Sequence, residues 1–365
     1  MELSIRRKAE QLYVSVASDV EAEREEGWGD VYLPHECLPE INRDEVNLST
    51  EFCGRCFRYP LMISALTGGH PEAAPVNEAL ARAAEHFGIG MELGSQSPLL
   101  GSPEMGYTYS IARAAAPSAF LMASIGASQL IHQEGENACT LEQIQRLIKA
   151  IRADALAIHL NFLQESVMPE GDAKAKGCTE AISMVAQALS IPVIVKETGA
   201  GISKAQALKL KRAGAFALDI GGAGGTSMAL VESHRARLHQ NPKYERLGTT
   251  FAHWGIPTVI SLIEAKTSGL PIIASGGITD GLQAAKALAL GADLVGVARP
   301  LLRCAIKGYE AVIEWLDVFF SELSIAMFLT SASSIKDLKR KKVVILGRSR
   351  QWLEQLGYHL RGTSE

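Results

Sequence analysis

The chain of 365 residues lacks long hydrophobic runs, an excess of charge and a dense set of cysteines. No stretch of about eighteen apolar residues is present, and the first residues (MELSIRRKAEQL) do not have the pattern of a signal peptide, so no membrane insertion is expected. A net charge of -4 offers no basic surface for nucleic acid. The six scattered cysteines suit a reducing cytoplasm, where we expect the protein to reside.

Two of the cysteines, Cys53 and Cys56, form a CxxC pair, and His35 and Cys37 lie upstream. These four residues could bind zinc, but a lone CxxC is weak evidence for a metal site. We favour a β-hairpin with Gly54-Arg55 at its turn.

Short apolar runs that stop at glycine or hydroxyl residues recur along the chain, and such runs are typical of buried parallel strands. They lie at residues 61–65, 89–93, 120–123, 155–158, 191–195, 217–220, 272–274 and 294–297. Amphipathic helical patterns separate them, for example over 76–87, 141–151, 204–213 and 281–290. Strands that alternate with helices in this way predict an α/β fold, the TIM (β/α)8 barrel.

No linker divides the chain, and 47% apolar composition is enough for one large core. We therefore expect a single domain over residues 1–365, with an N-terminal arm (1–56), an insertion between the sixth and seventh strands (227–262) and extra C-terminal helices. The arm opens on Arg6-Arg7-Lys8, a basic cluster that opposes the dipole of the helix it begins. It is either a solvated helix end or an arm that closes over an anionic substrate.

Two consecutive predicted loops favour a phosphate site. Ser275-Gly276-Gly277-Ile278 follows the seventh predicted strand, and Ala298-Arg299-Pro300 follows the eighth. Barrels of this kind commonly hold a phosphate there, on exposed backbone N–H groups. One glycine pair would indicate only tight packing, but two adjacent loops make phosphate binding the better interpretation.

Polar residues gather where the predicted strands end, which is the active-site face of this fold. They are Thr67, Ser95, Gln96, Ser124, His159, Asn161, Lys196, Thr226 and Ser275. Lys196 follows an all-apolar strand, where a lysine needs a negative or electron-rich partner. A phosphate with a buried lysine fits FMN, whose reduced ring the lysine would stabilise. Pyridoxal phosphate with Lys196 as its Schiff base is the alternative, although no acid or Arg can be placed for its ring nitrogen.

His159 and Asn161 alternate along the fourth predicted strand, so both point into the barrel mouth. Gln164 and Glu165 follow on the loop. Magnesium is often bound by one carboxylate together with substrate phosphates and waters. Taken alone, Glu165 could equally be a solvated loop acid.

A set of short motifs occurs along the chain. They are Arg7-Lys8, Leu66-Thr67-Gly68-Gly69, Gly94-Ser95-Gln96, His159-Leu160-Asn161, Leu163-Gln164-Glu165, Pro169-Glu170-Gly171-Asp172, Lys196-Glu197, Gly224-Gly225-Thr226-Ser227, Trp254-Gly255-Ile256-Pro257-Thr258, Ser275-Gly276-Gly277-Ile278 and Ala326-Met327-Phe328-Leu329-Thr330. Together they resemble type 2 isopentenyl diphosphate isomerase over nearly the whole chain. That family is an FMN- and magnesium-dependent TIM barrel, in which NAD(P)H reduces the flavin and a double bond moves with no net redox change.

The resemblance implies a small prenyl diphosphate substrate, a homo-oligomer (a tetramer or octamer) and roles for individual residues. His159, Asn161 and Gln164 would be catalytic, and Glu165 would bind magnesium. The substrate would contact Arg7, Lys8, Ser95, Gln96 and Gln164. The FMN would contact Leu66, Thr67, Gly68, Ser95, Ser124, Lys196, Thr226, Gly276, Gly277, Ala298 and Arg299.

Four positions depart from the family pattern: Gln11 stands for His, Ser97 for Arg, Ser124 for Asn and Phe162 for Pro. The missing arginine would have contributed roughly 1.5–3 kcal/mol to diphosphate binding. Two alternatives follow: a divergent FMN enzyme that acts on another prenyl or unsaturated substrate, and a non-catalytic flavin-binding protein. An FMN-dependent hydroxy-acid oxidase is less expected, because ASGGITDG lacks a paired His and Arg.

Overall fold

The computed structural model describes residues 3–21, 26–134, 137–172 and 174–358. Its centre is a closed barrel of parallel strands in the order β10-β11-β4-β5-β6-β7-β8-β9, which confirms the predicted TIM barrel. The strands are β4 (Leu61–Ile63), β5 (Gly90–Glu92), β6 (Phe120–Gly126), β7 (Ala155–Leu160), β8 (Val193–Glu197), β9 (Ala217–Asp219), β10 (Ile272–Ser275) and β11 (Leu294–Val297).

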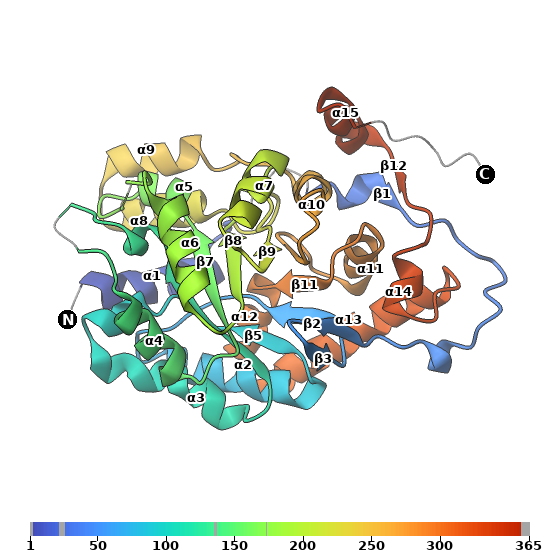
Figure 1. Cartoon of the computed structure of the whole chain (residues 1–365), viewed down its shortest axis with the longest axis horizontal. Helices are drawn as coiled ribbons and strands as arrows, with labels where there is room; N and C mark the ends of the chain where they lie inside the picture. Colours follow the sequence, from blue (N-terminus) through green and yellow to red (C-terminus); the bar gives the residue numbers. More distant parts are fainter. Residues whose placement is uncertain (1–2, 22–25, 135–136, 173, 359–365) are drawn as a thin grey trace.

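Helices surround the barrel and bury the outer faces of its strands (Figure 1). This burial on both faces explains why the strands are continuous apolar runs. The surrounding helices include α2 (Ala73–Phe87), α3 (Tyr107–Ala115), α4 (Leu141–Ala150), α6 (Cys178–Ala188), α7 (Lys204–Arg212), α10 (Thr258–Lys266), α11 (Gly281–Ala289), α12 (Arg299–Ala305) and α13 (Tyr309–Phe328). Several begin at capping side chains, such as Thr140 before α4 and Ser203 before α7.

A hairpin of β2 (Thr50–Phe52) and β3 (Arg55–Phe57) lies at the N-terminal end of the barrel, where its aromatic rings pack on Phe120 at the start of β6. This confirms the predicted hairpin, but the turn is one residue earlier than expected. Phe52 pairs with Arg55, so Cys53 and Gly54 form the turn. Both have positive φ, at 51° and 70°, as a two-residue hairpin turn requires.

The expected insertion forms two helices, α8 (Met228–Leu238) and α9 (Pro242–Thr250), followed by the start of α10. The helix of the N-terminal arm, α1 (Leu3–Ala17), packs on α8 and on α12 (Figure 1). Two segments far apart in sequence, β1 (Val31–Tyr32) and β12 (Val344–Ile345), pair antiparallel before α15 (Gly347–Gln355). The short helix α14 (Ile335–Leu338) precedes β12 in the sequence. None of the helices described is long and apolar enough to cross a bilayer.

Candidate active site

A cavity of about 290 Å³ opens at the C-terminal mouth of the barrel, between the strand ends, α1 and α8. It brings together most of the side chains and backbone that the sequence assigned to the site. Those that line it are Arg7, Lys8, Leu66, Ser95, Ser124, His159, Asn161, Gln164, Glu165, Lys196, Thr226, Gly276, Gly277, Ala298 and Arg299. Residues separated by almost 300 positions therefore share one cavity.

Thr67, Gly68 and Gln96 are not part of the lining that the structure describes. The Thr67 hydroxyl contacts His70 Nε2 at 2.8 Å, and Gln96 Nε2 donates to the backbone oxygen of Leu147 at 3.1 Å. A Cβ on Gly68 would lie 2.1 Å from the Tyr109 ring. These three residues contact parts of the protein behind the cavity wall. The sequence alone did not distinguish them from the residues that line the cavity.

The loops after β9 and β10 meet with no room for side chains. A Cβ on Gly276, whose φ is 105°, would lie 2.2 Å from the Gly222 oxygen, and one on Gly225 would lie 2.5 Å from the Gly277 nitrogen. The Glu26 side chain also lies against these loops, because a Cβ on Gly277 would meet its Cγ at 2.2 Å and one on Gly224 would meet it at 2.4 Å. A glycine cradle of this kind suits the phosphate of FMN.

Arg299 was expected to contact FMN, but its guanidinium points to the N-terminal arm. Its Nε donates to the backbone oxygen of Ser15 at 2.9 Å, and its Nη2 donates to that of Ser18 at 2.8 Å. Its Nη1 also pairs with Glu21. The arm thereby engages one N–H on each of the three guanidinium nitrogens.

Lys196 has the negative partners that its position required. Its Nζ lies 2.6 Å from Glu92 Oε2 and 3.2 Å from Asp219 Oδ2. Burial works to lower the pKa of Lys196, but Asp219 and Glu92 outweigh it, so the pKa lies above its ordinary value and the lysine is charged. The sequence analysis missed both acids, because each ends a short apolar strand and neither belongs to a motif.

His159 lies beside Ser124, with 3.3 Å between its Nδ1 and the serine Oγ. Burial lowers the pKa of His159 to about 3, and the positive charges of Lys8 and Lys196 add to the effect. The imidazole is therefore neutral near pH 7, and it acts in the cavity through hydrogen bonds.

The candidate metal ligand Glu165 is buried and fixed on both oxygens. Asn161 Nδ2 donates to its Oε1 at 2.7 Å, and the Asp172 N–H donates to its Oε2 at 2.9 Å. No cluster of three His, Cys, Asp or Glu side chains that could hold a metal occurs among the described residues. The arrangement fits Mg²⁺ only with oxygen ligands from a phosphate and water.

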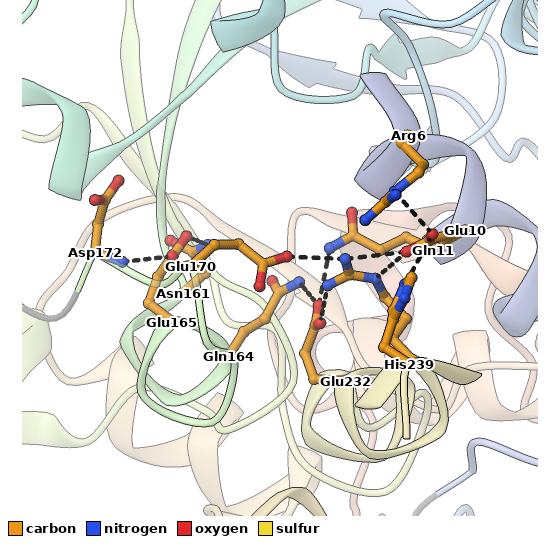
Figure 2. A network of polar contacts seen from close by, with 11 residues as sticks. Arg6, Glu10, Gln11, Asn161, Gln164, Glu165, Glu170, Asp172, Glu232 and His239 are labelled. Carbon is orange, nitrogen blue, oxygen red and sulfur yellow. Dashed lines mark hydrogen bonds and ion pairs between the residues drawn. The ribbon is translucent and has the colours of Figure 1, made fainter. Parts of the chain in front are cut away.

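A network around Glu232 on α8 was not predicted (Figure 2). Its Oε1 accepts from Gln164 Nε2 at 2.7 Å and from Gln11 Nε2 at 2.8 Å, and its Oε2 pairs with Arg235. Arg235 also pairs with two further acids, Glu10 of α1 and Glu170 of the loop after α5 (Phe162–Ser166). The network joins the arm, the insertion and the candidate catalytic glutamine, and no motif in the sequence indicated it.

Arg7 and Lys8 of α1 bring positive charge to the same side of the cavity. Burial, together with the neighbouring Arg7, lowers the pKa of Lys8 to about 8. Arg7 and Lys8 therefore face the cavity, so this part of the basic cluster is not the solvated helix end that was the alternative.

The sequence is similar to those of known proteins. A family model described as FMN-dependent dehydrogenase matches residues 161–345. An isopentenyl-diphosphate delta-isomerase of Methanosarcina mazei is 46% identical over 98% of this chain and 97% of its own length. The same enzyme of Pyrococcus horikoshii is 43% identical over 97% and 95%. The chain belongs to the isopentenyl-diphosphate delta-isomerase family. The resemblance seen in the sequence is thereby confirmed.

Solved structures of lower identity show the same barrel. A Pediococcus acidilactici protein described as a lactate oxidase is 18% identical, with a TM-score of 0.68 over 93% of this chain and 91% of that chain. A mandelate oxidase with (S)-2-phenylpropionate is 18% identical, with a TM-score of 0.61 over 93% and 96%. At this identity the likeness concerns the fold alone.

Proposed function

We propose that this chain isomerises isopentenyl diphosphate to dimethylallyl diphosphate, as part of isoprenoid biosynthesis, with FMN and Mg²⁺ as cofactors and NAD(P)H as the reductant of the flavin. The observation that carries the proposal is one cavity that joins a glycine cradle, a buried lysine, a cationic arm and a single carboxylate. Relatives named for this activity, at 43–47% identity over nearly the full chain, support it.

The residues divide the cavity into two ends. The glycines after β9 and β10 would hold the FMN phosphate, and Lys196 on β8 would lie under the ring. At the other end Arg7 and Lys8 would bind the diphosphate, and Glu165 would hold Mg²⁺ between itself and the phosphate oxygens. Residues 1–365 would then act as one FMN-binding unit, since the arm and the insertion complete the cavity.

The reaction moves a proton onto C4 of the homoallylic substrate and removes one from C2. When bound, the reduced flavin supplies an acid/base group and electron density beside the developing positive charge. Gln164, held by Glu232 at 2.7 Å, would orient the substrate's hydrocarbon end. The neutral His159 and Asn161 would contribute hydrogen bonds, and α1 would exclude water from the cation.

The test is an anaerobic assay of the purified protein with reduced FMN, Mg²⁺ and isopentenyl diphosphate. Formation of dimethylallyl diphosphate supports the proposal, and omission of Mg²⁺ or of reductant should abolish it. The cofactor released by heat is identified by mass spectrometry, where FMN is expected and pyridoxal phosphate would contradict the flavin assignment. FMN binding without turnover would favour a divergent enzyme or a non-catalytic flavin-binding protein.

A further inference from the structure

Three charged side chains meet at the floor of the cavity: Glu92 at the end of β5, Lys196 on β8 and Asp219 on β9. The side chains of Glu92 and Asp219 are 0% exposed and that of Lys196 is 7% exposed. Two carboxylates therefore surround one ammonium. When all three are ionised, the cluster carries one excess negative charge in a region with little water.

The two carboxylates are held differently. Ser275 Oγ donates to Asp219 Oδ1, and the Gly221 N–H donates in turn to Ser275 Oγ at 3.1 Å. Asp219 Oδ2 lies 3.2 Å from Lys196 Nζ and has no hydrogen-bond partner of its own among the described residues. Glu92 Oε2 accepts from Lys196 and from the Ala65 N–H at 3.3 Å, whereas its Oε1 has no hydrogen-bond partner among the described residues.

None of the other described groups that face the cluster is as free to take up a proton as Glu92 Oε1. His159 on β7 is the register partner of Lys196, and its lowered pKa keeps it neutral, with Lys8 beyond it. Glu197, the next residue after Lys196, has its Oε2 engaged by four backbone N–H groups of residues 198–201. From β6 and the end of β4, the polar side chains of the lining are the uncharged hydroxyls of Ser124 and Ser64.

We propose that Glu92 takes up one proton at Oε1 each time FMN is reduced in this cavity, and so balances the charge that reduction adds. The proposal rests on the FMN part of the proposed function. A hydride donor of the dihydronicotinamide class gives the ring two electrons and one proton, which leaves one negative charge on the ring. One further proton from solvent then bonds to Glu92 Oε1, and Lys196 keeps Asp219 as its partner.

As a consequence, the summed charge of the flavin ring and the three side chains stays the same when the flavin is reduced. An uncompensated negative charge would act against the anionic diphosphate in the same cavity, because such charges interact strongly where water is excluded. Glu92 thereby lets the flavin be reduced without weakening the site for the diphosphate.

The test is the midpoint potential of the FMN-loaded protein between pH 6 and 9, without substrate. A two-electron couple shifts about 30 mV per tenfold change in proton concentration for each proton it takes up. The wild-type protein should shift about 59 mV per pH unit, as expected for two protons, and Glu92→Gln should shift about 30 mV. A wild-type slope of about 30 mV, or an unchanged slope in Glu92→Gln, would overturn the proposal.

Glu197→Gln is the matched control, because burial raises the pKa of Glu197 to about 7 although four N–H groups oppose this. It should keep the two-proton slope. A halved slope in Glu197→Gln but not in Glu92→Gln would assign the proton to Glu197 and refute the role of Glu92.

A second measurement needs no variant to fold. The reduced-minus-oxidised infrared spectrum of the wild-type protein should show a new protonated carboxyl band that shifts in D2O, and its absence would refute the proposal. Failure of isomerisation with FMN bound would overturn the proposed function alone, since neither measurement uses substrate. A protein that binds no FMN would overturn both.

Discussion

Arg299 Nε on α12 donates to the backbone oxygen of Ser15 at 2.9 Å, which ties the end of α1 to the barrel. The same guanidinium also holds Ser18 and pairs with Glu21. Since α1 carries Arg7 and Lys8, which face the cavity, Arg299 sets where these two residues lie at its mouth.

Arg299→Lys should loosen the arm, because an ammonium cannot reproduce the planar fork that holds two carbonyls and a carboxylate. Loss of these charged hydrogen bonds, about 1.5–3 kcal/mol, should raise the KM for isopentenyl diphosphate roughly tenfold or more. FMN affinity should stay within about twofold, since the three contacts that are lost go to the arm and not to the glycines after β9 and β10. Steady-state kinetics and flavin titration give the two values. The exposed Arg303, on the same helix, provides the control Arg303→Lys, which should change neither.

Lys8 should make substrate binding depend on pH, because burial and Arg7 lower its pKa to about 8. Below this pH the ammonium is present and binds the diphosphate, and above it the charge is lost. We expect kcat/KM to fall as pH rises through about 8, approaching tenfold per pH unit. Lys8→Arg keeps its charge throughout, so its profile should stay flat to higher pH. An identical alkaline fall in both proteins would show that another group titrates.

Glu232→Gln should lower both stability and turnover. The carboxylate is 1% exposed and pairs with Arg235, which keeps Glu10 and Glu170 as partners. We expect the free energy of unfolding to drop by about 1–3 kcal/mol, and kcat to fall because the amide has one acceptor oxygen, which Arg235 and Gln164 then compete for. Denaturant unfolding and kinetics measure these effects. Glu245→Gln, in the exposed pair with Arg237 of α8, should cost less than about 1 kcal/mol.

The barrel could be predicted because each strand is a continuous apolar run that ends in a small or hydroxyl residue. The position of the active site was also predictable, because in a parallel barrel it lies at the C-terminal ends of the strands. The hairpin turn was placed one residue late, because Gly54 can serve at either turn position and the pattern does not show that Cys53 adopts positive φ.

Partners that meet only in three dimensions could not be predicted. Glu92 and Lys196 are 104 positions apart and come together because their strands face each other across the barrel. Arg299 lies in a recognisable loop, but its side chain turns to an arm 284 positions earlier. Gln96 and Ser95 are neighbours in the sequence, yet only Ser95 lines the cavity, whereas Gln96 Nε2 donates to the backbone oxygen of Leu147 on α4.

Glu165→Gln should raise the Mg²⁺ concentration needed for half-maximal rate about tenfold or more, because it neutralises the carboxylate placed beside the phosphate site. The amide keeps the shape of the side chain, so FMN binding should not change. Titration of the rate with Mg²⁺ gives the value. Glu104→Gln, at an exposed site on a short helix of residues 103–106, is the control and should need no extra Mg²⁺. An unchanged requirement in Glu165→Gln would remove this residue from the metal site.

Ser97 lines the cavity at the start of a short helix of residues 97–100, and Ser95 Oγ donates to its Oγ at 3.2 Å. The family pattern places an arginine here, so in the proposed function Arg7, Lys8 and a Mg²⁺ held by Glu165 would have to neutralise most of the diphosphate charge. Phe162, which replaces the proline of the family pattern, packs against the hydrophobic core and is not among the described residues that line the cavity. The lining therefore has an uncharged serine at the position where the family pattern has a cation.

Ser97→Arg should restore that cation and lower the KM for isopentenyl diphosphate about tenfold, since 1.4 kcal/mol corresponds to a factor of ten. A bidentate contact to phosphate oxygens supplies at least this much when the arginine has room. Ser97→Gln, which adds length without charge, separates the two effects and should leave KM unchanged or higher. Kinetics at several salt concentrations should show the gain shrinking with ionic strength if it is electrostatic. An equal KM in all three proteins, or no turnover in any, would mean that position 97 does not face a diphosphate and that this cavity holds another substrate.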